Sequence, residues 1–97
     1  MSFQQQYMNE IPVDDEYELF VRAWTAYHET AHRIDGHIPP GHPDQGRLGH
    51  LAVRAGKEAM AKHIHPSVIQ DAMRNNDWRT YHKWQHAKLE ALRRLKL

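Results

Sequence analysis

An apolar residue recurs every three or four positions between Tyr17 and Ile34, and this spacing constrains the fold more than any other feature of the chain. One face of an α-helix repeats at this interval, so the pattern predicts a helix over residues 15–34. Asp14 or Asp15 can cap its first turn. The residues of this apolar stripe are Tyr17, Phe20, Trp24, Tyr27, Ala31 and Ile34.

The rest of the chain shows further helical segments and no alternation typical of a strand. A second helix, rich in the small residues that allow a neighbour to approach closely, is expected over residues 46–63. A short helix begins at Pro66, and a last one runs from about residue 77 to the end. The last helix is predicted to bury Trp78, Tyr81, Leu89, Leu92 and Leu95. We therefore predict an all-α fold, a small bundle of three longer helices and one short helix.

Two segments lack helical periodicity. Residues 1–13 carry a glutamine run and are expected to form a flexible arm before a single helical domain over residues 14–97. Residues 36–46 are rich in proline and glycine, which predicts a loop after the first helix. Pro39 and Pro40 hold an extended backbone at low entropic cost, which suits docking into a partner, but a plain connecting loop is the more common role of such a segment.

Cysteine content, hydropathy and charge restrict the class of protein. The chain has no cysteine, which excludes disulfides and thiolate chemistry. No apolar run approaches the roughly 20 residues that span a bilayer, and no signal peptide is recognised at the start, so a cytoplasmic protein is expected. Residues 1–35 carry seven acidic and two basic side chains, whereas residues 36–97 carry five and eleven. This asymmetry predicts either attraction between the two halves within the fold or contacts of the two ends with different surfaces.

Residues 28–32 (HETAH) match the HExxH pattern of zinc hydrolases. Two imidazoles one helical turn apart can share a zinc ion, and the glutamate can activate its water. Nine histidines raise the odds of a chance match, and the positions that follow depart from the protease pattern. We expect no metal and no cofactor, and we keep a small zinc-dependent hydrolase that uses His28, Glu29 and His32 as an alternative. The other closely spaced histidines are His63, His65, His82 and His86.

The last helix combines positive charge with aromatic residues, a composition that suits a protein interface. Trp84 lies at the margin of the apolar stripe and is predicted to be the exposed aromatic residue. Basic side chains attract phosphate and aromatic rings stack on unpaired bases, so nucleic-acid binding is a second alternative. A helix with a buried apolar side and a solvated basic face is the remaining interpretation. The predicted partner-binding residues are Trp84, Arg79, Lys83, Lys88, Arg93, Arg94, Pro39 and Pro40.

The chain opens with Met1-Ser2-Phe3-Gln4-Gln5-Gln6-Tyr7 and closes with Arg93-Arg94-Leu95-Lys96-Leu97, with a histidine-rich middle. Over this whole length it resembles the second anti-RecBCD proteins of lambdoid Salmonella phages. The resemblance implies a non-enzymatic early protein of the host cytoplasm that binds the host RecBCD exonuclease-helicase, chiefly through its RecC subunit. Binding would modify the nuclease so that linear phage DNA ends survive and enter recombination. The resemblance implies no catalytic residue.

Overall fold

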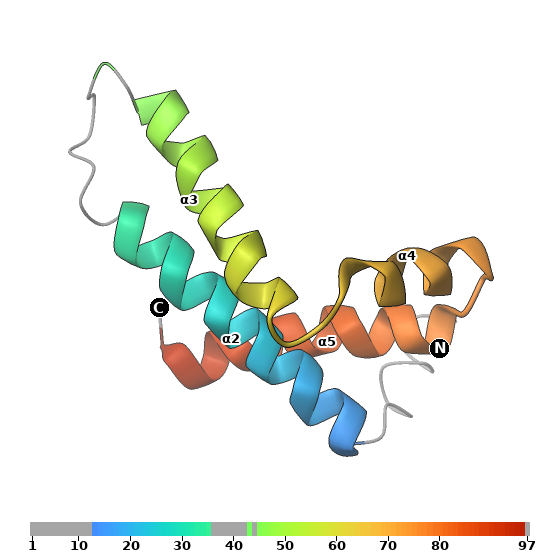
Figure 1. The fold of residues 1–97 in the computed structure, drawn as a ribbon. Helices are drawn as coiled ribbons and strands as arrows, with labels where there is room; N and C mark the ends of the chain where they lie inside the picture. Colours follow the sequence, from blue (N-terminus) through green and yellow to red (C-terminus); the bar gives the residue numbers. More distant parts are fainter. Residues whose placement is uncertain (1–12, 36–42, 44, 97) are drawn as a thin grey trace, which may run out of the picture.

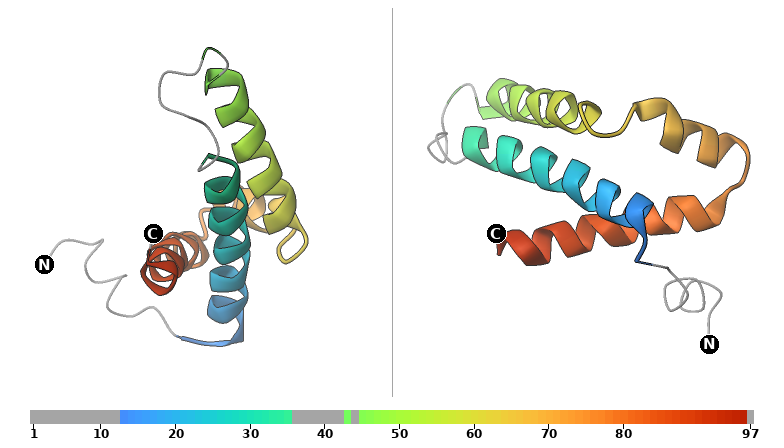
Figure 2. Two further views of the ribbon diagram at one scale, coloured as in Figure 1. Left: turned by 90° about the vertical axis from the view of Figure 1, so that its left-hand side faces the viewer. Right: turned by 60° about the horizontal axis from the view of Figure 1, so that its bottom comes forward.

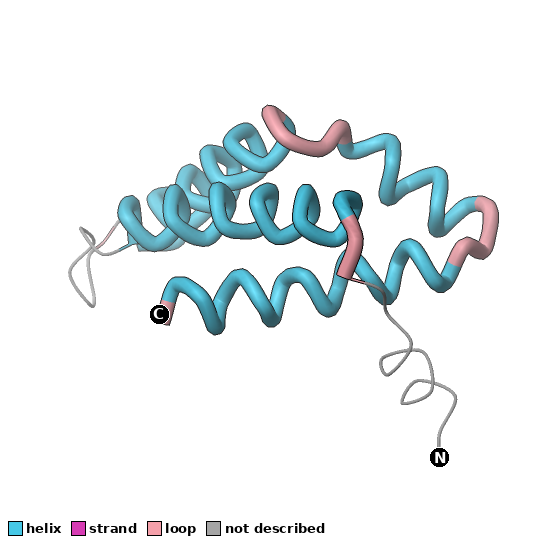
Figure 3. Tube along the Cα trace, turned by 90° about the horizontal axis from the view of Figure 1, so that it is seen from below, coloured by secondary structure: helices cyan, strands magenta, loops and turns pink. Residues whose placement is uncertain are grey.

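The computed structural model describes residues 13–35, 43 and 45–96, which form four α-helices (Figure 1). These are α2 (Asp15–Asp35), α3 (Gln45–Ala61), α4 (Pro66–Arg74) and α5 (Trp78–Leu95). The described residues contain no strand (Figure 3), so the predicted all-α fold with three longer helices and one short helix is confirmed. None of these helices is long and apolar enough to cross a membrane. Residues 1–12 of the predicted arm and Pro39 and Pro40 of the predicted loop lie outside the described residues.

The starts of three helices follow from their capping residues. Asp14 caps α2, because its side chain accepts a hydrogen bond from the backbone amide of Tyr17 at 2.8 Å. His65 caps α4 in the same way, and Pro66 occupies a first-turn position where no helical N–H is needed. Asp77 caps α5. Local sequence therefore fixes where these helices begin.

α2 is the central helix of the fold. It packs against both α3 and α5, and α4 packs against α5. The right-hand view of Figure 2 shows α2 between α3 and α5, with α4 opposite the first turns of α5. The core joins α2 to α5 and to the turn that follows α3. Its buried members are Tyr17, Phe20, Val21, Ala23, Ile64, Trp84, Ala87 and Ala91.

The contact between α2 and α3 is close because α3 presents small residues. Ala52 and Gly56 are buried there. A Cβ atom added at Gly56 would lie 2.8 Å from Cδ2 of Tyr27 and 3.1 Å from the Tyr27 carbonyl oxygen. The close helix approach expected from the small residues of this segment is confirmed.

The buried side of α5 differs from the predicted one. Trp78 and Leu89, predicted to be buried, are 43% and 57% exposed. The residues that α5 does bury are Lys83, Trp84, Ala87 and Ala91. Two alanines let the backbone of α5 approach α2, and the bulk of a single tryptophan fills the remaining space. The apolar stripe alone was misleading because it gave weight to large side chains and none to alanine.

Candidate functional site

Lys83, predicted to bind a partner, is instead part of the contact between α2 and α5. Its side chain is buried, and its Nζ donates to Oδ2 of Asp14 at 2.9 Å and to Oε1 of Glu16 at 3.0 Å. Burial alone would lower the pKa of Lys83, but the two carboxylates reverse this effect and raise it. The hydrogen bond from Lys83 lowers the pKa of Asp14. Because both partners lie on the same chain, the charge of Lys83 is neutralised within the fold.

Arg93 and Arg94 also bind acidic residues of their own chain. The guanidinium of Arg94 donates to both carboxylate oxygens of Glu18, each at 3.2 Å, and its Nε donates to Glu90 at 3.0 Å. Arg93 donates to Glu90 as well. Arg93 first and Arg94 second lower the pKa of Glu90 to about 2. The guanidinium of Arg94 lowers the pKa of Glu18.

These ion pairs explain the uneven distribution of charge along the sequence. Lys83 and Arg94 of the basic half bind Asp14, Glu16 and Glu18 of the acidic half. The expectation that the two halves attract each other within the fold is confirmed. Part of the positive charge that favoured nucleic-acid binding is therefore already engaged.

Trp84 was predicted to be exposed, and this prediction is wrong. Its side chain is 7% exposed and meets Phe20 edge to face, with ring centroids 5.2 Å apart. Trp24 packs against it at 4.6 Å and donates from Nε1 to the Trp84 carbonyl oxygen at 2.9 Å. The Nζ of Lys88 lies 5.2 Å from the ring centroid of Trp24, so this cation also contacts the fold. Arg79 is exposed in the first turn of α5.

The HExxH residues do not share one environment. His28 is half-buried and stacks on Trp24, whereas Glu29 and His32 are exposed. Within the described part of the chain, no group of three or more His, Asp or Glu residues could hold a metal ion. The geometry thus brings together no zinc site from residues 28–32.

Several other histidines have structural contacts. His65 caps α4, and Nδ1 of His86 forms a hydrogen bond with the Tyr17 hydroxyl at 2.8 Å. The ring of His82 meets that of Tyr81 edge to face. Among the described residues, none of these histidines belongs to a group of three or more that could hold a metal ion.

The structure contains an apolar groove where α3, α4 and α5 meet. It has a volume of about 360 Å³ and is lined by Lys57, Met60, Ile64, Pro66, Ile69, Gln70 and Trp84. We call this surface the α4 groove. Trp84 reaches the groove although most of its ring is covered, and its packing against Phe20 and Trp24 holds it in place. A preformed apolar pocket with few polar groups is typical of a binding site.

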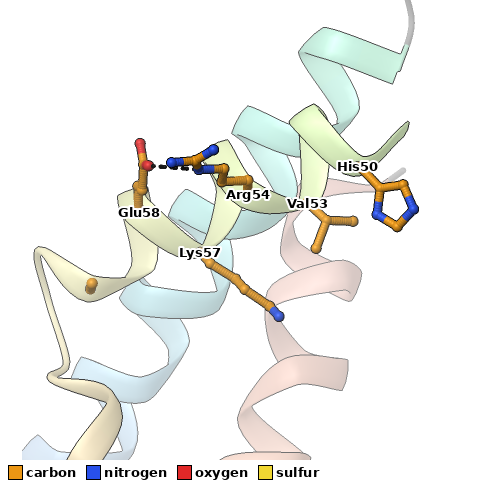
Figure 4. A pocket seen from close by; sticks show the side chains of 6 residues that line it. His50, Val53, Arg54, Lys57 and Glu58 are labelled. Atoms are coloured by element: carbon orange, nitrogen blue, oxygen red, sulfur yellow. Dashed lines mark ion pairs between the residues drawn. The ribbon is translucent and has the colours of Figure 1, made fainter. Parts of the chain in front are cut away.

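A lysine lines this groove. Lys57 is among its lining residues, and Lys62 is exposed on the turn that follows α3. Figure 4 shows a second pocket on α3, which shares Lys57 with the groove; in it Lys57 extends away from Arg54 and Glu58, whose side chains pair with each other. Lys57 therefore keeps its charge available to a ligand that enters the groove.

Exposed apolar side chains continue from the groove along α4. Val68 is 41% exposed and Met73 is 50% exposed, and Trp78 follows at the start of α5. The sequence analysis missed this region because it assigned no function to the short helix and placed Trp78 in the core. The available signal was the apolar composition of such a short helix, which has little surface on which to bury all of its apolar residues.

Comparison with protein families, with curated proteins and with solved structures gives no match. The candidate site therefore rests on its geometry alone.

Proposed function

We propose that the chain is a non-enzymatic protein-binding module, and that its α4 groove receives an apolar side chain of a large partner. The observation that carries this proposal is the groove itself, with Trp84 at its base and Ile64, Met60 and Ile69 around it. Its volume of about 360 Å³ is sufficient for one large side chain. Burial of such an anchor is a common source of binding energy in protein interfaces.

The charge around the groove selects the class of partner. Lys57 lines the apolar groove and Lys62 is exposed on the turn after α3, so we expect an acidic segment with an apolar anchor. The acidic residues of such a segment are attracted to the lysines as the partner approaches, and its apolar side chain is buried once the segment has docked. The partner that the sequence resemblance implies is the RecBCD exonuclease-helicase, through its RecC subunit, and we propose it as the protein that carries such a segment.

Two substitutions test the groove by different mechanisms. Lys57→Glu reverses the charge in the groove, and Gln70→Trp fills part of its volume. Arg33→Glu on α2 and Gln85→Trp on α5 are matched controls, because both residues are exposed and neither lines the groove. Circular dichroism establishes that each variant keeps its helices before binding is measured.

Binding to purified RecBCD is then measured for the wild type and the four variants. The samples are first treated with nuclease to remove nucleic acid. We expect the wild type to bind and each groove variant to bind about tenfold more weakly or worse, with the controls within about twofold. Failure of the wild type to bind RecBCD overturns the assignment of this partner. Equal binding by groove variants and controls overturns the groove as the binding surface. Binding that disappears after nuclease treatment supports the nucleic-acid alternative.

A further inference from the structure

His28 has a buried polar atom that nothing in the described structure satisfies. Its Nε2 is buried and has no hydrogen-bond partner. The imidazole stacks on Trp24, with ring centroids 5.6 Å apart and an interplanar angle of 19°, and meets Tyr27 edge to face. Buried polar atoms without partners are uncommon in folded proteins, so such an atom calls for a physical explanation.

The charged group that acts on His28 from α5 is Lys88, a cation. From α3, the helix on the other contact surface of α2, the buried residues are Ala52 and Gly56, which carry no charge. On α2 itself, the neighbouring Glu29 and His32 are exposed. Burial first and the charge of Lys88 second lower the pKa of His28. The neutral ring suits this site, whereas a protonated ring would lack an acceptor and would face a like charge.

We propose that His28 is an acid-sensitive latch between α2 and α5, which is closed when the imidazole is neutral and loosened when it is protonated. The stacked ring supports Trp24, and Trp24 donates its indole N–H to the Trp84 carbonyl oxygen of α5. A proton on His28 must be solvated, so water has to enter or α5 has to move away with Lys88. Either change disturbs the tryptophan pair that joins the two helices. This proposal stands independently of the proposed function.

The direction of the pH effect follows from linkage. In the unfolded chain His28 binds a proton near its ordinary pKa of 6.5, whereas in the folded chain it binds one only at lower pH. The unfolded state therefore takes up more protons as the pH falls below 6.5, and the free energy of unfolding decreases. The stabilisation is fully present above that pH and is lost on acidification.

His28→Phe tests the latch, because phenylalanine keeps a flat ring beside Trp24 and cannot be protonated. His50→Phe is the matched control on an exposed position of α3. Urea unfolding is measured at about pH 7.5 and about pH 5. We expect the wild type and the control to lose about 0.5 M or more in midpoint on acidification, and His28→Phe to lose clearly less. An equal loss of urea midpoint in all three proteins overturns the proposal.

A titration of the wild type by NMR decides the matter if His28→Phe does not fold. We expect the His28 ring to titrate below the ordinary imidazole pKa of 6.5. The indole N–H resonances of Trp24 and Trp84 should shift with the same midpoint as His28. A His28 midpoint at or above 6.5, or indole resonances that do not follow it, contradicts the latch.

Discussion

α2 contacts its two neighbouring helices in different ways. Toward α3 it meets small residues, and Tyr27 lies against Gly56 with no room for another carbon atom. Toward α5 it uses a tryptophan pair and ion pairs, among them Lys83 with Asp14. Both contacts depend on close packing, because α5 also buries Ala87 and Ala91, but the second depends in addition on charge and on directional hydrogen bonds.

The difference shows which kind of change each contact tolerates. A close contact between backbone and ring is sensitive to added volume, because interiors are packed without spare space. A contact between partly exposed carboxylates and a buried cation tolerates changes of volume but not of charge sign. Reversal of a charge should therefore affect the second contact selectively, and added volume at Gly56 should affect the first.

The largest effect is expected from Lys83→Glu. The substitution places a third carboxylate beside Asp14 and Glu16 at a buried position, and we expect a loss of at least about 3 kcal/mol in the free energy of unfolding. Lys83→Met is the control: both acidic side chains are nearly half exposed and can turn to water, so its cost should stay within about 1 kcal/mol. Urea unfolding measures both. Equal losses would mean that charge is not what joins α2 to α5.

An intermediate effect is expected from Gly56→Ala. The new methyl group meets the Tyr27 ring and carbonyl oxygen, so we expect a net loss of about 1–2 kcal/mol even though alanine favours a helix. Gly49→Ala on the same helix is the matched control, because a Cβ there has nothing within 4 Å. The free energy of unfolding of this control should increase by up to about 1 kcal/mol, because alanine has a higher helix propensity than glycine. Thermal unfolding compares the stability of the two variants. An increase in stability in both variants would contradict the close contact between α2 and α3.

The smallest effect is expected at Glu90. Its pKa is lowered to about 2 by Arg93 and Arg94, so its contribution to stability is present above its ordinary pKa of 4.5. This contribution is lost as the pH falls from 4.5 toward 2, because the unfolded state then binds the proton more readily. Glu90→Gln should flatten this part of the curve of melting temperature against pH. Asp71→Asn, at an exposed pair on α4, should leave it unchanged. If the melting temperatures of both variants follow the wild-type curve, the Glu90 ion pairs make no net contribution to stability.

Much of the helical architecture could be predicted from the sequence. The helix predicted over residues 15–34 spans Asp15–Asp35, and the short helix begins at Pro66 as expected. These elements depend on periodicity, capping and proline, which act within a few residues. The ends of α3 and α5 also agree with the prediction to within two residues.

The candidate site could not be predicted because it depends on how α5 is rotated against α2. The sequence favoured Trp84 as exposed and Trp78 as buried, and the structure has the reverse. The rotation follows from Ala87 and Ala91, which allow close approach, and from the acidic residues that bind Lys83. Neither effect is visible within a single helix. The apolar groove also requires side chains from three helices, so no local pattern encodes it.

By itself, the sequence of this protein determined the positions of the helices, and its uneven charge gave attraction between an acidic and a basic half as one of two interpretations. The tertiary structure alone decided which face of α5 is buried, which charges are used within the fold and where an apolar groove remains. The physical reason is the distance along the chain over which each interaction acts. Capping and periodicity act over one or two turns of a single helix, whereas burial and ion pairing depend on residues such as Asp14 and Lys83, which are 69 positions apart.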